Sequence, residues 1–119
     1  MPLGHSELLA ILSIGHDTSM RGEGISLREA LARTHYAALR ADFAAADLLP
    51  LLSANHALIQ QWVAYSEDKR TSGGWYLTGA GEIGTVEAPR GKGHFGCLEE
   101  AVAEYVLREL DFWAGLAAS

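Results

Sequence analysis

The sequence predicts an α+β fold, in which a single, mostly helical domain of four to six helices carries one antiparallel β-hairpin, at about residues 74–88, packed on the helices. Apolar residues recur at helical spacing through most of the 119 residues. One short segment has the composition of two strands around a glycine turn. The length fits one globular domain over residues 1–119, which can bury a core without metals or disulfides.

The N-terminal part is predicted to be helical. Residues 6–14 form an apolar run that fits a short helix, although a strand is an alternative for so brief a run. Gly15 to Gly24 would be a loop, because its glycines interrupt any regular pattern. Ser26 and Glu29 have the spacing of a capping box, which predicts a helix from there to about Arg40.

Two further helices are expected before the hairpin. Asp42 could cap a short helix that runs through Ala46. Pro50 would then interrupt the pattern or lie in the first turn of another short piece. Asn55 is a good N-cap for a longer helix, which we expect to reach about Arg70.

The hairpin and the last helix follow. Trp75 to Thr78 has strand composition, Gly79 to Gly81 is a short glycine turn, and Glu82 to Glu87 is predicted to be the returning strand. A lone hairpin is marginal in water, so it must lie on helices. The last helix should span Leu98 to Trp113 and stop at Gly115.

Glu109 is the most unusual residue of the last helix, because it falls near the middle of its apolar stripe. At helical spacing this stripe contains Leu98, Val102, Tyr105, Val106, Phe112 and Trp113. A carboxylate there must find a partner, take up a proton or mark a pocket. The same angular count places Ser66 and Lys69 on the stripe of the preceding helix. Tyr105 lies one turn before Glu109, and His35 lies on or beside the inner face of its own helix.

These polar residues allow several interpretations. Glu109 could bind a cationic or donor-rich ligand in an interior pocket with Lys69, Tyr105 and His35, or could act as a base there. It could instead form a structural ion pair, or accept from a backbone donor. A third alternative is that the carboxylate bends outward to solvent near the end of the helix.

A glycine-rich segment precedes the last helix. Residues 91–96 match the pattern G-x-G-x-x-G, but no parallel strand follows the helix, so we predict no dinucleotide site and no cofactor. Arg90 and Lys92 could hold an anion at the helix start. Glu99 and Glu100 would repel that anion, and the alternative is a plain connection.

Cys97 lies at or near the N-cap of the last helix, where the position alone can lower the pKa of a thiol. With His94 three residues earlier, it is a candidate nucleophile or redox thiol. The alternative is that Cys97 stands where a capping serine would. The pair of His94 and Cys97 is only half of a zinc site, and no second pair has ligand spacing, so we predict no metal.

Trp75 and Tyr76 form the candidate interaction surface. Alternation along a strand turns the two rings to opposite faces, so one of them could be exposed to a partner. The alternative is that both rings pack on the protein's own helices.

Charge and hydropathy exclude some functions. A net charge of −6 disfavours nucleic acid and anionic membranes as partners. The apolar run from Leu8 to Ile14 is too short to span a bilayer. No Lys or Arg precedes Arg21, so a signal peptide would lack its charged region, and we expect a cytoplasmic protein.

No catalytic motif is complete in the sequence, which favours a non-catalytic binding or regulatory module over an enzyme. Such a module would act through protein–protein contacts, either with another protein or with its own copy as a homodimer. The alternative is a small-ligand-binding protein or small enzyme with an interior polar pocket around Glu109.

Overall fold

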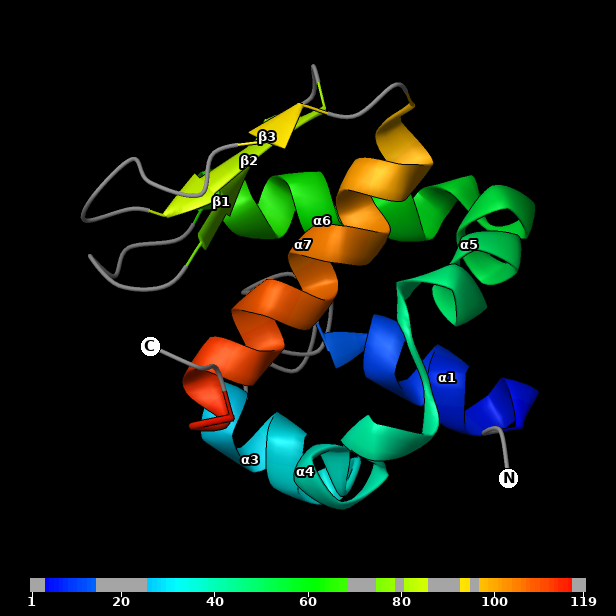
Figure 1. Cartoon of the computed structure of the whole chain (residues 1–119), viewed down its shortest axis with the longest axis vertical. Helices are drawn as coiled ribbons and strands as arrows, with labels where there is room; N and C mark the ends of the chain where they lie inside the picture. The colour runs from blue at the N-terminus through cyan, green and yellow to red at the C-terminus, as the bar shows by residue number, and fades with distance from the viewer. Residues whose placement is uncertain are drawn as a thin grey trace.

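Helix α7 (Leu98–Trp113) runs through the middle of the molecule, and the other elements pack around it (Figure 1). The computed structural model describes residues 4–14, 26–68, 75–78, 81–85, 93–94 and 97–116. The other elements in chain order are α1 (His5–Leu12), α3 (Leu27–Arg33), α4 (Tyr36–Leu39), the 3-10 helix η1 (Arg40–Asp42), α5 (Ala45–Ala54), α6 (His56–Asp68), β1 (Trp75–Leu77), β2 (Glu82–Thr85) and β3 (Gly93–His94). Helix α5 and strand β1 make the most extensive contacts with α7.

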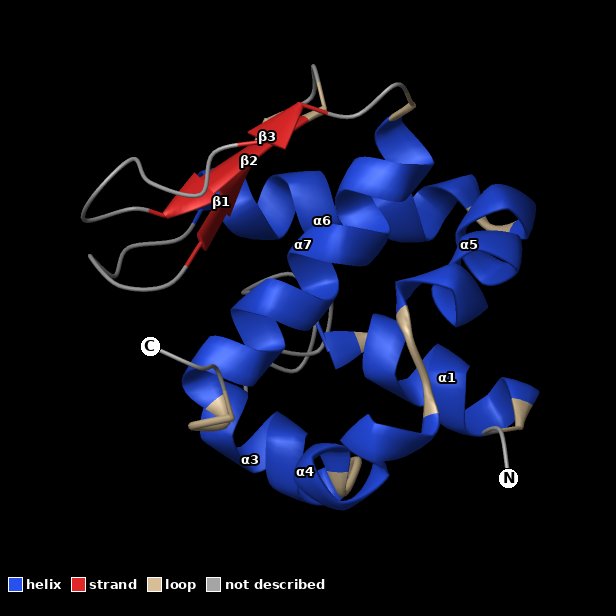
Figure 2. Cartoon of the chain, viewed as in Figure 1, coloured by secondary structure: helices blue, strands red, loops and turns tan. Residues whose placement is uncertain are grey.

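Helices make up most of the described chain, and the small sheet lies to one side, against α6 and α7 (Figure 2). Strands β1 and β2 pair antiparallel, with Trp75 opposite Thr85 and Leu77 opposite Ile83. This arrangement confirms the predicted α+β fold with a hairpin packed on helices. None of the described helices combines the length and the apolar composition needed to cross a membrane.

A third strand, β3, was not predicted. It is only two residues long and pairs antiparallel with β2, so the order of the sheet is β1-β2-β3. The sequence around it is rich in glycine and has no β-branched residue, so its composition does not indicate a strand. Its pairing therefore depends on β2 rather than on its own composition.

The predicted helix from Ser26 to about Arg40 is broken after Arg33. Ser26 does cap α3, because its side chain accepts a hydrogen bond of 3.1 Å from the backbone N–H three residues further on. The helix ends where the Thr34 hydroxyl donates to the carbonyl four residues before it, at 3.1 Å. His35 then adopts a left-handed conformation with φ 54°, which an α-helix cannot continue through.

Two predictions for the region of α5 are wrong in detail. Asp42 does not cap a helix, because it lies in η1 and α5 begins at Ala45. The Asp47 carboxylate accepts a hydrogen bond of 2.8 Å from the backbone N–H of Ala44 and so supports the start of α5. Pro50 lies inside α5 and is exposed, so the helix continues past the residue that we expected to interrupt it or to begin another piece.

Two predicted helix boundaries are confirmed. Helix α6 begins directly after Asn55. Gly115 ends α7 with φ 75°, and its N–H donates to the Phe112 carbonyl at 3.2 Å. The N–H of Leu116 donates to the Asp111 carbonyl at 2.8 Å. These two bonds form a Schellman motif, which explains why a glycine is needed at this position.

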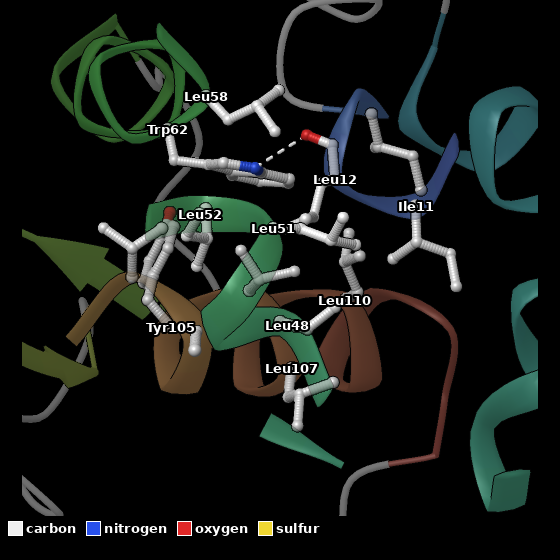
Figure 3. Packing of buried hydrophobic residues seen from close by; sticks show 14 of the residues in the cluster. Ile11, Leu12, Leu48, Leu51, Leu52, Leu58, Trp62, Tyr105, Leu107 and Leu110 are labelled. Carbon is white, nitrogen blue, oxygen red and sulfur yellow. Dashed lines mark hydrogen bonds between the residues drawn. The ribbon is translucent and has the colours of Figure 1, made fainter. Parts of the chain in front are cut away.

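The hydrophobic core lies between α1, α5, α6 and α7 (Figure 3). The indole N–H of Trp62 donates to the Leu12 carbonyl at 2.8 Å, which ties α6 to the end of α1 inside this core. The largest side chains that are almost completely buried are Trp62, Tyr36, Tyr105, Ile11, Leu12, Ile14, Leu48, Leu52, Ile83, Leu110, Glu109 and Val102. Glu109 is the charged residue in this set, and it defines the candidate site.

Candidate functional site

Glu109 lies in the interior, as its place on the apolar stripe of α7 predicts, and its exposed fraction is 0%. Its Oε1 atom accepts a hydrogen bond of 2.8 Å from the backbone N–H of Trp75. Its Oε2 atom accepts a hydrogen bond of 2.9 Å from the Tyr65 hydroxyl. Both carboxylate oxygens therefore have donors from the chain itself, one on β1 and one on α6.

The open edge of β1 explains why a carboxylate is needed there. Strand β1 is an edge strand of the sheet, and such strands present backbone N–H and C=O groups that lack a neighbouring strand. Ser66 Oγ accepts from the Leu77 N–H at 2.7 Å, and the Tyr105 hydroxyl donates to the Trp75 carbonyl at 3.3 Å. Together with Glu109, these side chains on α6 and α7 bond to β1 where another strand would otherwise pair.

We refer to Ser66, Tyr105 and Glu109 as the edge-capping cluster. Glu109 accepts from the Trp75 N–H, Tyr105 donates to the Trp75 C=O, and Ser66 accepts from the Leu77 N–H. The cluster thus offers an acceptor, a donor and an acceptor in the order that the backbone of β1 needs. Side chains on helices thus satisfy the hydrogen-bonding groups of the strand backbone, so these polar residues have a structural role. In the described part of the chain, every buried side-chain nitrogen or oxygen has a hydrogen-bond partner.

Aromatic rings surround the cluster. The Trp62 ring packs edge-on against Tyr65, with centroids 5.2 Å apart, and against Tyr105, at 6.2 Å. Burial raises the pKa values of Tyr65 and Tyr105 well above the ordinary range, and the negative charge of Glu109 raises both pKa values further. Both hydroxyls therefore stay protonated at neutral pH and act as donors.

The structure brings together only part of the predicted pocket. Glu109 and Tyr105 lie in one cluster, and Ser66, from the stripe of the preceding helix, completes it. His35 does not join them, because the tight turn between α3 and α4 holds it at the surface, where it is exposed. Lys69 lies outside the described residues.

The two aromatic residues of the predicted interaction surface are half-buried. The Arg108 guanidinium lies over the Trp75 ring, 4.9 Å from its centroid, and its Nε atom bonds to Glu104 at 2.9 Å. The Tyr76 ring lies across Gly84 of β2, where an added Cβ would be 2.7 Å from the tyrosine oxygen. Both rings therefore pack in part on the protein's own chain.

Cys97 is exposed and is the N-cap residue of α7, as predicted, but its thiol makes no capping hydrogen bond of ordinary geometry. The Glu100 backbone N–H lowers the pKa of the thiol, yet desolvation and the Glu99 and Glu100 carboxylates outweigh it, so the pKa of Cys97 is raised. A raised pKa is the opposite of what an activated thiol needs. His94 lies in β3, and Arg90 and Lys92 lie outside the described residues.

A second polar cluster was not found from the sequence. The Tyr36 hydroxyl donates to Asp111 Oδ1 at 2.6 Å, and Arg40 Nε donates to the two Asp111 oxygens at 2.9 and 3.1 Å. We refer to Tyr36, Arg40 and Asp111 as the Asp111 cluster. Burial, and then the hydrogen bond to Asp111, raise the pKa of Tyr36 above its ordinary range. The cluster ties α4 and η1 to α7. Tyr36 and Arg40 lie 75 and 71 residues before Asp111, so no local spacing in the sequence indicates the contact.

A surface patch was also missed. Phe112, Trp113 and Leu116 are large apolar residues with exposed fractions of 43%, 38% and 44%. The rings of Phe112 and Trp113 pack edge-on with centroids 5.0 Å apart. We refer to these residues as the α7-end patch. Helical periodicity had assigned Phe112 and Trp113 to the buried stripe, but the core ends before the helix does.

Among the residues that the structure describes, no three His, Cys, Asp or Glu side chains gather so as to hold a metal ion. Comparisons with protein-family models, with curated proteins and with solved structures gave no match. The function is therefore inferred from the geometry of the edge-capping cluster and the α7-end patch.

Proposed function

We propose that this protein is a non-catalytic binding module that acts through protein–protein contacts. The observation that carries the proposal is the state of Glu109, which is completely buried with both carboxylate oxygens bonded to Tyr65 and Trp75 of the same chain. The most unusual polar group of the molecule thus has a structural task, and it needs no ligand to satisfy it.

The α7-end patch supplies a contact surface for such a module. Apolar side chains that remain in water keep an unfavourable hydration free energy, which a partner can remove. Phe and Trp are enriched at protein interfaces, where a few aromatic anchors contribute much of the binding energy. Phe112 and Trp113 lie next to each other at the end of α7, so a partner can contact both at once.

A site-specific cross-linking experiment tests the proposal. A photo-reactive amino acid would replace Phe112, and the same group at His56, which is exposed at the start of α6, serves as the control. We expect adducts of defined mass from position 112 and none from position 56. A cross-linked dimer in the purified protein would identify its own copy as the partner, and an adduct only in cell extract would identify another protein.

Two outcomes would overturn the proposal. The first is equal, background-level labelling from positions 112 and 56 in both purified protein and extract. The second is a small molecule that stays bound in native mass spectrometry of the purified protein and is lost in the variant Glu109→Gln. That result would instead support the alternative of an interior ligand site around Glu109.

A further inference from the structure

The end of α7 reaches beyond the hydrophobic core. Leu110 is completely buried, but the residues after it are half-buried or exposed as far as Leu116. The last turn of a helix frays easily, because its final carbonyl groups lack the hydrogen-bond partners that the helix interior provides. The α7-end patch lies on and just after this turn, so its side chains keep fixed positions only where other contacts hold the turn in place.

Asp111 holds the last turn in two ways. Its carboxylate accepts from the Tyr36 hydroxyl at 2.6 Å and from Arg40 Nε at 2.9 and 3.1 Å, which ties the turn to α4 and η1. Its backbone carbonyl accepts from the Leu116 N–H at 2.8 Å and so closes the Schellman motif. The whole α7-end patch lies within the segment that these bonds fix.

The charge of Asp111 is unfavourable for α7 itself. The C-terminal end of a helix carries a partial negative charge, so a carboxylate in the last turn destabilises the helix, where a cation would stabilise it. The last turn of α7 contains no basic residue. The Arg40 guanidinium supplies the positive charge from η1 instead. A local role within α7 therefore does not explain Asp111, whereas its contact with α4 and η1 does.

The donors to Asp111 are themselves held in place by Phe43. Tyr36 is completely buried, and its ring packs edge-on against the Phe43 ring, with centroids 6.1 Å apart. Arg40 Nη1 donates to the Phe43 carbonyl at 3.0 Å, and the guanidinium lies 5.3 Å from the centroid of the same ring. A contact surface that such supporting interactions hold in position loses less conformational entropy when it binds.

We propose that Asp111 positions the α7-end patch: by bonding to Tyr36 and Arg40, it fixes the last turn of α7 and holds the side chains of the patch as one ordered contact surface. The inference rests on the proposed function, because it assigns Asp111 a part in binding at this patch. It adds that binding depends on a contact between residues more than 70 positions apart.

Backbone order at the end of α7 tests the proposal without any partner. Asp111→Ala removes the bonds to α4 and η1. Local helix propensity predicts a better-ordered turn in this variant, because alanine favours the helix and an unfavourable charge is lost. Our proposal predicts the opposite: the NMR order parameters of the Phe112 and Trp113 amides, about 0.85 in the unaltered protein, should fall toward about 0.6. Unchanged or higher order parameters would overturn it.

Two further variants separate the Asp111 cluster from the rest of α7. Tyr36→Phe removes only the hydrogen bond from α4 and should lower the same order parameters by a smaller amount, although it lies 75 residues before Asp111. Glu104→Ala is the control, because it breaks the ion pair with Arg108 elsewhere on α7 and should leave the order parameters unchanged. Equal effects of these two variants would overturn the proposal. If Asp111→Ala does not fold, this comparison decides.

Cross-linking distinguishes this inference from the proposed function. With the photo-reactive amino acid at position 112, Asp111→Ala should reduce the yield of defined adducts at least about threefold, whereas Glu104→Ala should not. An adduct yield that Asp111→Ala leaves unchanged would overturn the inference and leave the proposed function standing. If position 112 gives no adduct in the unaltered protein, the proposed function fails, and the order parameters still decide whether Asp111 fixes the turn.

Discussion

A carboxylate in the centre of a helix's apolar stripe is costly unless donors reach its oxygens. Glu109 receives those donors from Trp75, 34 residues earlier, and Tyr65, 44 residues earlier. A leucine would suit the apolar environment better but could not accept either bond. The residue therefore serves the backbone of β1, and its acidity matters less than its two acceptor oxygens.

Substitutions of Glu109 separate these two properties. We expect Glu109→Leu to lower the free energy of unfolding by about 2–3 kcal/mol, because the Trp75 N–H and the Tyr65 hydroxyl lose their acceptor. Glu109→Gln keeps an acceptor oxygen and should cost about 1 kcal/mol. Urea unfolding measures both values. A leucine variant as stable as the unaltered protein would contradict this account.

Cys97 shows how neighbouring charge decides the character of an exposed thiol. The Glu100 N–H lowers the pKa of the thiol, but desolvation and then the Glu99 and Glu100 carboxylates outweigh this effect, so the pKa is raised. We expect the rate of alkylation to rise with pH to a midpoint above the ordinary thiol value. In the variant with Glu99→Gln and Glu100→Gln the midpoint should fall. A midpoint below the ordinary value in the unaltered protein would restore the activated-thiol hypothesis.

Within the hairpin, the pairing of Tyr76 with Gly84 holds the two strands in register. A Cβ at position 84 would lie 2.7–2.8 Å from the Tyr76 hydroxyl and ring, so the ring would have to move. We expect Gly84→Ala to cost about 1 kcal/mol in urea unfolding. In a protein that already carries Tyr76→Ala, Gly84→Ala should lower the free energy of unfolding by clearly less, because the tyrosine ring that the new Cβ would meet has been removed. Strict additivity of the two changes would show that they do not interact.

The turn between α3 and α4 depends on a single residue. His35 adopts φ 54°, which costs a residue with a Cβ roughly 1–2 kcal/mol and costs glycine little. Its side chain is exposed, so its removal loses little packing. We expect His35→Gly to raise the free energy of unfolding by about 0.5–1 kcal/mol, and the β-branched control His35→Val to lower it. If urea unfolding showed the valine variant to be more stable than the glycine variant, the left-handed conformation of His35 would be contradicted.

The broken helix shows where local patterns stop being sufficient. Periodicity and a capping box predicted one helix from Ser26 to about Arg40, and the start is correct. The break places Tyr36 and Arg40 against Asp111. That contact involves residues more than 70 positions apart, so no window along the chain could indicate it.

For the whole molecule, the tyrosines predict the response to alkaline pH. Burial raises the pKa values of Tyr36, Tyr65 and Tyr105 in the folded state. The folded protein therefore holds these protons more tightly than the unfolded chain does. Their stabilising contribution is complete below the unfolded tyrosine pKa of about 10 and is lost as the pH rises above it.

We expect the free energy of unfolding to fall by about 4 kcal/mol between about pH 8 and about pH 11, because each of the three tyrosines loses about 1.4 kcal/mol one pH unit above its unfolded pKa. Urea unfolding at the two pH values measures the change, and absorbance of tyrosinate reports ionisation. Tyr36→Phe removes one of the titrating groups and should make the fall shallower. Stability that does not change over this range would show that these hydroxyls ionise freely in the folded state.

The sequence by itself determined the class of fold, the caps at Ser26 and Gly115, the position of the hairpin and the place of Glu109 on the apolar stripe of its helix, because each depends on local spacing and composition. Only the tertiary structure decided what Glu109 does. Donors on β1 and α6 bond to its carboxylate, and whether a buried carboxylate faces a ligand, a cation or a strand edge depends on which distant segment packs against it. Packing also decides why Phe112 and Trp113 are exposed. Helical periodicity gives the face of a helix on which a residue lies, but it does not show how far along the helix the neighbouring elements extend.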